Sequence, residues 1–179
     1  MTERVQKAEL GYWMKDLESP AFRGRVIREL MDLMDAEYQE RKWEVVQGRN
    51  YFREEMYFSF ELIADDLMSY YVENNEQPYE QIGVYLKTKP EAEILYAIGE
   101  TLLRLFRENK DDQSILSSPD LQLIRKLSKE AFIEFMKGEK DNEKFCEFII
   151  ECMKAEGRDY KIDANKADYE NIIAFAESR

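Results

Sequence analysis

Apolar residues recur at spacings of three and four along most of the chain, which is the spacing of one face of an α-helix. The clearest stripe lies in residues 53–72 and consists of Met56, Phe60, Ile63, Leu67 and Tyr70. No segment alternates apolar and polar residues beside a hairpin turn, as a half-buried strand would. The pattern therefore predicts an all-α protein.

Helix boundaries are indicated by prolines, glycines and capping residues. Ser19-Pro20 and Ser118-Pro119 each place an N-cap residue before a proline at the first helical position. Thr88 and Glu91 have the spacing of a capping box, and Asp141 is the expected N-cap of a later helix. We expect helices over residues 3–17, 20–34, 35–46 and 53–72, a long helix after Thr88, and helices over 118–138, 141–157 and 165–176. Residues 79–86 fit either a short helical turn or an extended piece.

The length of 179 residues and the apolar content of 44% suit one domain with its own core. We therefore expect residues 1–179 to form a single compact, irregular bundle of seven or eight helices. We expect residues 109–117 to form a connector. If the chain has two subdomains, the division between them lies at this connector.

The composition excludes several chemistries. The chain has no histidine, which removes Ser-His and Cys-His catalysis and imidazole metal ligands. Cys146 and Cys152 lie six residues apart, about 240° around one helix, so they cannot form a disulfide and are expected in the core. We expect a cytoplasmic protein, because no apolar stretch is long enough for a membrane span and the start does not resemble a signal peptide.

The charge balance of 26 basic and 38 acidic residues gives a net charge of −12. Nucleic acids and anionic membranes are disfavoured as partners, because both are bound mainly through lysine and arginine. A basic protein would be attracted and its association accelerated. Acidity that serves only solubility is the alternative explanation.

The acidic charge is concentrated in residues 54–86, which contain eight carboxylates and no lysine or arginine. On the expected helix, Glu54, Glu61 and Asp65 lie opposite the apolar stripe, with Phe58 among them. Acidic groups around an aromatic residue suit a partner that brings lysine or arginine around an apolar patch. The predicted partner-binding residues are Glu54, Phe58, Glu61, Asp65, Asp66, Glu73 and Glu76.

The same carboxylates permit a metal site. Glu54, Glu55, Glu61 and Asp65 offer oxygen ligands for Mg²⁺, as in all-helical hydrolases of nucleoside triphosphates. Such a site needs a second acidic pair on a facing helix. The candidates for this pair are Glu91 and Glu93, or residues among Asp32, Asp35 and Glu37. The expectation is nevertheless a protein that is not an enzyme and needs no cofactor or metal.

Two segments resemble a known group of proteins. Residues 19–43, with MDAEYQERKW, and residues 79–105, with IGVYLKTKPEAEILYAIGETL, resemble a family of small acidic bacterial proteins, mostly without assigned function. Relatives of similar build serve as immunity proteins that neutralise toxins. From Ser118 onward the chain departs from that family. The resemblance implies a partner-binding role.

The sequence predicts an interaction protein that binds and neutralises a basic protein partner. The most specific version of this prediction is an immunity protein that neutralises a toxin domain. The alternatives are the Mg²⁺-dependent hydrolase and a structural or regulatory homodimer.

Overall fold

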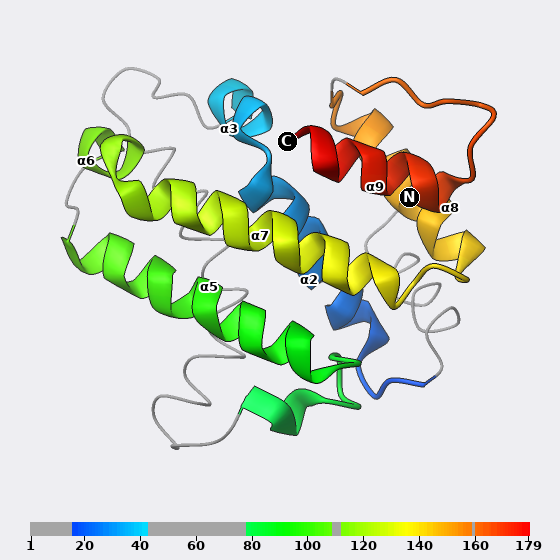
Figure 1. Cartoon of the computed structure of the whole chain (residues 1–179), viewed down its shortest axis with the longest axis horizontal. Helices are drawn as coiled ribbons and strands as arrows, with labels where there is room; N and C mark the ends of the chain where they lie inside the picture. The colour runs from blue at the N-terminus through cyan, green and yellow to red at the C-terminus, as the bar shows by residue number, and fades with distance from the viewer. Residues whose placement is uncertain (1–15, 43–77, 109–111, 159) are drawn as a thin grey trace.

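The computed structural model describes residues 16–42, 78–108, 112–158 and 160–179. These residues form seven α-helices and one 3₁₀ helix, and they contain no strand, only an isolated bridge between Ile82 and Leu86. The all-α prediction is confirmed (Figure 1). The helix expected over 53–72 and residues 3–15 of the helix expected over 3–17 lie outside the described residues, and Asp16 and Leu17, at the end of the latter, form a turn rather than helix.

The elements in chain order are α2 (Pro20–Met34), α3 (Ala36–Lys42), η2 (Pro78–Gln81), α5 (Lys89–Glu108), α6 (Asp112–Ser117), α7 (Pro119–Lys137), α8 (Glu143–Ala155) and α9 (Asp168–Ser178). Helix α7 is central, because α5, α2 and α9 all pack against it. Figure 1 shows α5 and α7 side by side with α2 behind α7, while α8 and α9 pack together at one end.

Local capping explains several of these boundaries. The Ser118 side chain accepts a hydrogen bond from the backbone N–H of Asp120 at 3.3 Å, and Gly138 is the C-cap of the same helix. Asn142, rather than the expected Asp141, caps α8, since its Oδ1 accepts the backbone N–H of Phe145. The predicted cap was therefore wrong by one residue.

The expected connector at 109–117 contains a helix. Residues 112–117 form α6, and the apolar Ile115 of this helix is buried. The helices on the two sides of the connector, α5 and α7, pack against each other along their length. The place proposed for a division between subdomains thus lies between two helices in direct contact.

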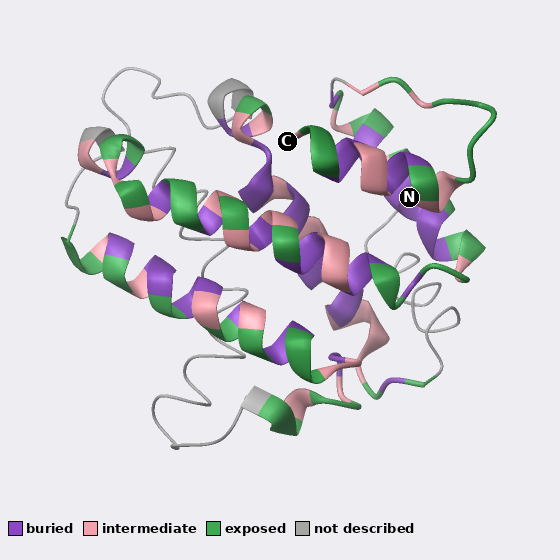
Figure 2. Ribbon diagram, viewed as in Figure 1, coloured by how far each residue is buried: buried purple, intermediate pink, exposed green. Residues whose placement is uncertain are grey.

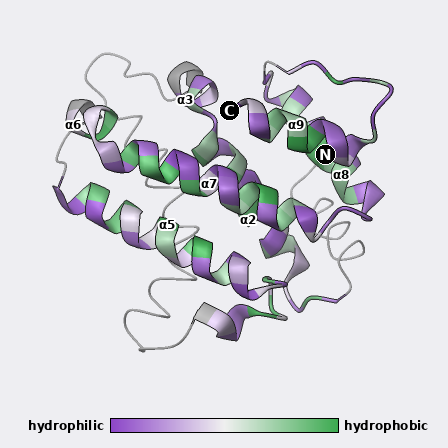
Figure 3. Cartoon of the chain, viewed as in Figure 1, coloured by the Kyte–Doolittle hydropathy of each residue, from purple (hydrophilic) through white to green (hydrophobic). Residues whose placement is uncertain are grey.

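The core is built from the stripes that the helical spacing predicts. Leu95, Ile98, Leu102 and Leu105 of α5 are completely buried, each contributing about 1.5–3 kcal/mol in transfer free energy. Helices α2, α7, α8 and α9 bury corresponding faces, and their buried residues are the purple parts of the ribbon in Figure 2. The hydrophobic colouring of Figure 3 follows the same helical periodicity.

Residues 79–86 combine a 3₁₀ turn with a second tight turn. Gly83 has φ of +93°, a conformation that favours glycine because it lacks a Cβ. The backbone N–H groups of Glu18 and Ser19 donate to the carbonyls of Gly83 and Val84, which ties this turn to the start of α2. None of the described helices is long and apolar enough to cross a membrane.

Candidate functional site: an acidic pocket beside α8 and α9

Most of the sequence-predicted site lies outside the described residues. This applies to the partner-binding set Glu54, Phe58, Glu61, Asp65, Asp66, Glu73 and Glu76, and to Glu55 of the alternative metal set. At the described end of the acidic stretch, Tyr79 and Glu80 are both exposed.

The aromatic residues at this end of the stretch have different roles. Tyr79 is exposed, its hydroxyl donates to Glu93 at 3.0 Å, and the ammonium of Lys89 lies 4.9 Å from its ring centre. Tyr85 is buried, with its ring edge-on to Phe22 at 4.6 Å between ring centres. Tyr79 therefore lies at the surface, where Glu93 and Lys89 engage it, whereas Tyr85 belongs to the core.

Arg23 is a completely buried charge between α2, α5 and the end of α7. Its guanidinium donates to both carboxylate oxygens of Glu91, at 2.8 and 3.0 Å, and its Nε donates to Glu139 at 2.6 Å. The carbonyls of Tyr85 and Phe135 accept the other two N–H groups. All five donors of the side chain are thus satisfied, as a buried arginine requires.

Arg158 forms a second buried cluster between the end of α8 and the junction of α2 with α3. It pairs with Asp32, with Asp35 at 2.9 Å and with Glu156 at 2.8 Å. Its guanidinium lies 3.9 Å from the centre of the Tyr38 ring. Burial raises the pKa of Asp32 to about 7, against the opposing effect of Arg158, and the neighbouring carboxylate of Glu156 adds to the rise.

These clusters bear on the metal alternative. Glu91 is bound by Arg23, and both Asp32 and Asp35 are bound by Arg158, so their oxygens are already engaged by arginines. Across the described ranges, no group of three or more Asp, Glu or Cys side chains is arranged to hold a metal ion. Glu54, Glu55, Glu61 and Asp65 themselves lie outside those ranges.

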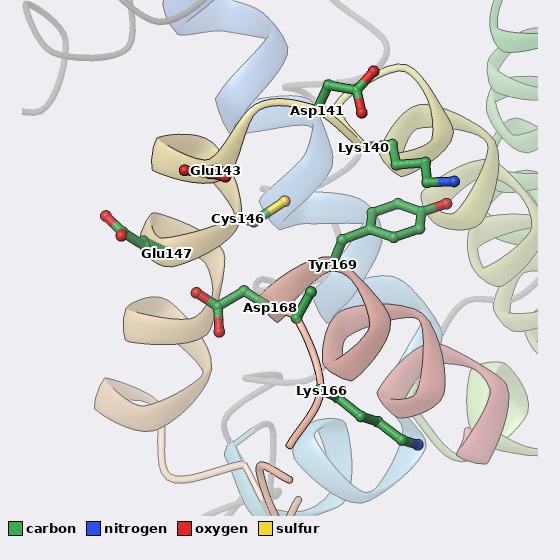
Figure 4. Close-up of a pocket in the computed structure, with 9 residues that line it drawn as sticks. Lys140, Asp141, Glu143, Cys146, Glu147, Lys166, Asp168 and Tyr169 are labelled. Atoms are coloured by element: carbon green, nitrogen blue, oxygen red, sulfur yellow. The ribbon is translucent and has the colours of Figure 1, made fainter. Parts of the chain in front are cut away.

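A cavity of about 540 Å³ opens between the start of α8 and the start of α9. The charged groups in its lining are four carboxylates and two lysines, a net formal charge of −2, and they are Asp141, Glu143, Glu147, Asp168, Lys140 and Lys166. Figure 4 shows Glu143, Glu147 and Asp168 around Cys146 on one side, with Lys140 and Tyr169 on the other. We call this cavity the acidic pocket.

The helix starts explain why the carboxylates gather here. Glu143 lies in the first turn of α8 and Asp168 in the first turn of α9, where the positive ends of helix dipoles favour acidic side chains. Glu147, one turn further along α8, pairs with Lys144 at 2.9 Å. Because the two helices begin at the same cavity, their acidic first turns face it together.

The pKa of the Cys146 thiol reflects the negative charge of the acidic pocket. Burial raises the pKa of its thiol to about 12, and the carboxylates of Asp168, Glu139 and Glu143 add to the rise by disfavouring a thiolate. The thiol is therefore protonated at neutral pH and suits neither nucleophilic attack nor metal binding. The same negative surroundings favour a cation, such as the ammonium or guanidinium end of a side chain.

Sequence reasoning did not identify the acidic pocket. The interpretation treated Asp141 only as a cap and Cys146 only as a core residue, although Cys146 is indeed buried. The available signal was a pair of helix starts that both carry acidic first turns, at Glu143 and Asp168. That signal does not show which helix starts lie next to each other, because the packing of the helices determines their neighbours.

When the chain is compared with protein-family models, curated proteins and solved structures, none of them matches it. Its function must therefore be inferred from its residues and their geometry.

Proposed function

We propose that this protein acts in the cytoplasm and binds a basic protein partner through the acidic, aromatic surface of residues 54–80. In its sharpest form it is an immunity protein of a bacterial toxin system, which neutralises a toxin by covering a basic surface. An acidic surface of this kind accelerates the encounter with a basic partner and selects against acidic ones.

The observation that carries the proposal is the missing counter-charge. Residues 54–86 contain eight of the 38 acidic residues of the chain and none of its 26 basic residues. Acidic residues kept for solubility alone would be expected to alternate with basic ones. An unbalanced stretch of this length suits a complementary charge on another molecule.

The ion pairs elsewhere in the bundle add support. Ten of the described basic side chains pair with acidic residues that are also described: Arg23, Arg28, Lys87, Lys89, Arg104, Lys126, Lys137, Lys144, Arg158 and Arg179. These cations already have acidic partners outside residues 54–80.

The described residues also offer acceptors of their own. Glu80 is exposed at the end of the acidic stretch, where its carboxylate suits a lysine or arginine side chain of a partner. The acidic pocket, with its net charge of −2, is a separate place where a basic side chain would be favoured.

The test is the rate of association with a captured basic protein. The tagged chain is used at low salt to isolate partners from cells of its natural host, and the partner is then purified. Replacing Glu61, Asp65 and Asp66 by lysine should slow association about tenfold or more and remove most of its salt dependence. A control with the same change in charge replaces the exposed Glu100, Glu108 and Glu151 of α5 and α8 by lysine.

The control distinguishes an effect of the proposed surface on the association rate from an effect of the total charge of the chain. Slower association in the Glu61, Asp65 and Asp66 variant, with a near-normal rate in the control, supports the proposed surface. Equal rates in the two variants, or a captured partner that is not basic, would contradict it. Toxin neutralisation requires in addition that the purified partner loses its toxic activity when this chain is added.

A further inference from the structure

A second cavity, of about 390 Å³, lies where the junction of α2 with α3 and the end of α9 meet the middle of α7. In Figure 1 the C-terminal end of α9 lies beside α3, and α9 packs against α7. We call this cavity the α7–α9 pocket. It lies apart from the acidic pocket and shares none of its lining residues.

The charge of the α7–α9 pocket is opposite to that of the chain. Its lining contains four cations, Arg125, Lys126, Lys129 and Arg179, and one carboxylate, Glu37, so the formal charges of the lining side chains sum to +3. Two of these cations also have acidic partners: Lys126 pairs with Glu130 at 3.9 Å, and Arg179 pairs with Glu37 and with Asp35 at 3.7 Å. The whole chain carries −12. Arg125, Lys126 and Lys129 all come from α7, where Lys129 lies four residues after Arg125 and three after Lys126, the spacings that place side chains close together on a helix. Like charges held together in this way favour a bound anion.

Buried groups fix the position of Arg125. The side chain of Gln39 is completely buried, and its Nε2 donates to the carbonyls of Asp32 and Leu33 at 2.9 and 2.8 Å. Its Oε1 accepts the Nε of Arg125 at 2.9 Å. Because the amide can hardly rotate without losing these bonds, it holds the guanidinium at the wall of the pocket.

Arg179 is also held in place. Its side chain is only 8% exposed, its guanidinium lies 4.9 Å from the centre of the Phe175 ring, and it pairs with Glu37. Lys129 donates to the carbonyl of Glu177 at 3.1 Å, so its ammonium lies at the end of α9. Cations that are ordered before a ligand arrives lose little conformational entropy when it binds.

We propose that the α7–α9 pocket binds a small anion that carries a phosphate group. Guanidinium groups match the geometry of phosphate oxygens, and the cations of the lining outnumber its single carboxylate, which favours an anion. The pair of Lys126 with Glu130 is exposed and contributes little, so Lys126 can turn toward a bound anion. The cavity volume is in the range of small-molecule sites, about 300–1,000 Å³. A long polyanion such as DNA would also meet the acidic remainder of the surface, whereas a small anion meets mainly the local charge.

The test measures binding of defined phosphates by calorimetry at constant ionic strength. The probes are inorganic phosphate, pyrophosphate and glycerol phosphate, with chloride and sulfate as reference anions. The Lys126→Gln/Lys129→Gln variant should bind the phosphates about tenfold or more weakly. The matched control is Lys154→Gln/Lys161→Gln, whose two exposed lysines lie outside the pocket and remove the same charge.

Each result of the calorimetry either supports or overturns the proposed phosphate site. Tightest binding of glycerol phosphate identifies a phosphate ester as the ligand, and tightest binding of inorganic phosphate or pyrophosphate identifies a free inorganic anion. Both results support the pocket if only the Lys126/Lys129 variant is impaired. No binding, equal binding of sulfate, or an equal loss in the control variant would overturn the proposal. Lys126 has a side chain that is 71% exposed, so its replacement leaves folding intact.

Discussion

Arg23 and Glu91 form a bidentate ion pair with no solvent exposure, although 68 residues separate them in the sequence. Arg23 comes from the first turn of α2 and Glu91 from the first turn of α5. Glu91 also accepts the backbone N–H groups of Lys87 and Thr88. One carboxylate thus completes the cap of α5 and neutralises the buried charge of α2.

Breaking this pair should be strongly destabilising. Arg23→Met leaves Glu91 buried without its cation, so we expect the free energy of unfolding to fall by about 3–5 kcal/mol. The double variant Arg23→Met/Glu91→Leu should lose much less than the sum of the two single changes, because Glu139 keeps Lys87 as a partner at 2.9 Å. Urea denaturation of the four proteins measures this coupling, and additive losses would show that the pair is not a coupled unit.

Asp32 should make stability depend on pH. Burial raises its pKa from 3.8 to about 7 in the folded protein, so the folded state holds this proton more tightly than the unfolded state. The contribution of Asp32 is complete below pH 3.8 and is lost as the pH rises through 7. Between about pH 4 and 7, Asp32→Asn should therefore remove a decline in stability that the wild type shows.

Urea denaturation at several pH values measures the effect of Asp32. The control is Glu151→Gln, which removes a carboxylate from an exposed position of α8. We expect the control to keep the wild-type slope of unfolding free energy against pH. The same slope in all three proteins would contradict the prediction.

Cys146 should react slowly with alkylating reagents in the folded protein. A rise in its pKa from 9.0 to about 12 lowers the thiolate fraction at pH 8 roughly a thousandfold. In a Cys152→Ala background, iodoacetamide should modify Cys146 slowly in buffer and at the ordinary rate of a free thiol in urea. Mass spectrometry follows the reaction. Equally fast modification in buffer would mean that the site is neither buried nor negative.

Magnesium should not stabilise the protein if the partner-binding proposal is correct. A metal that binds only the folded state raises the melting temperature, so a titration to about 5 mM Mg²⁺ or Mn²⁺ gives a direct test. We expect no shift. A rise that disappears in the Glu61→Gln/Asp65→Asn variant would instead support the hydrolase alternative.

The helices were largely predictable because local interactions define them. The start of α2 at Pro20, the Thr88–Glu91 capping box and the C-cap of α7 at Gly138 follow from residues within one turn of each boundary. The wrong N-cap prediction for α8 also has a local cause. Asp141 and Asn142 are both residues that cap helices well, and the backbone geometry selects Asn142.

The charge pattern was less informative about individual side chains. Arg23, Arg25 and Arg28 lie within six residues of one helix, close in sequence to Glu29 and Asp32. In the fold Arg23 is buried, Arg25 is exposed and Arg28 pairs with Glu156. Neighbouring positions on one helix point in directions about 100° apart, so each arginine has its own surroundings.

The sequence by itself determined that this chain is helical, strongly acidic and without histidine, and it located where most described helices begin and end. Only the tertiary structure decided that Arg23 would meet Glu91 and Glu139, and that two pockets of opposite charge would form. The physical reason is the distance along the chain over which each interaction acts. Capping and helical periodicity act over a few residues, whereas ion pairs and pockets depend on which faces of distant helices pack together.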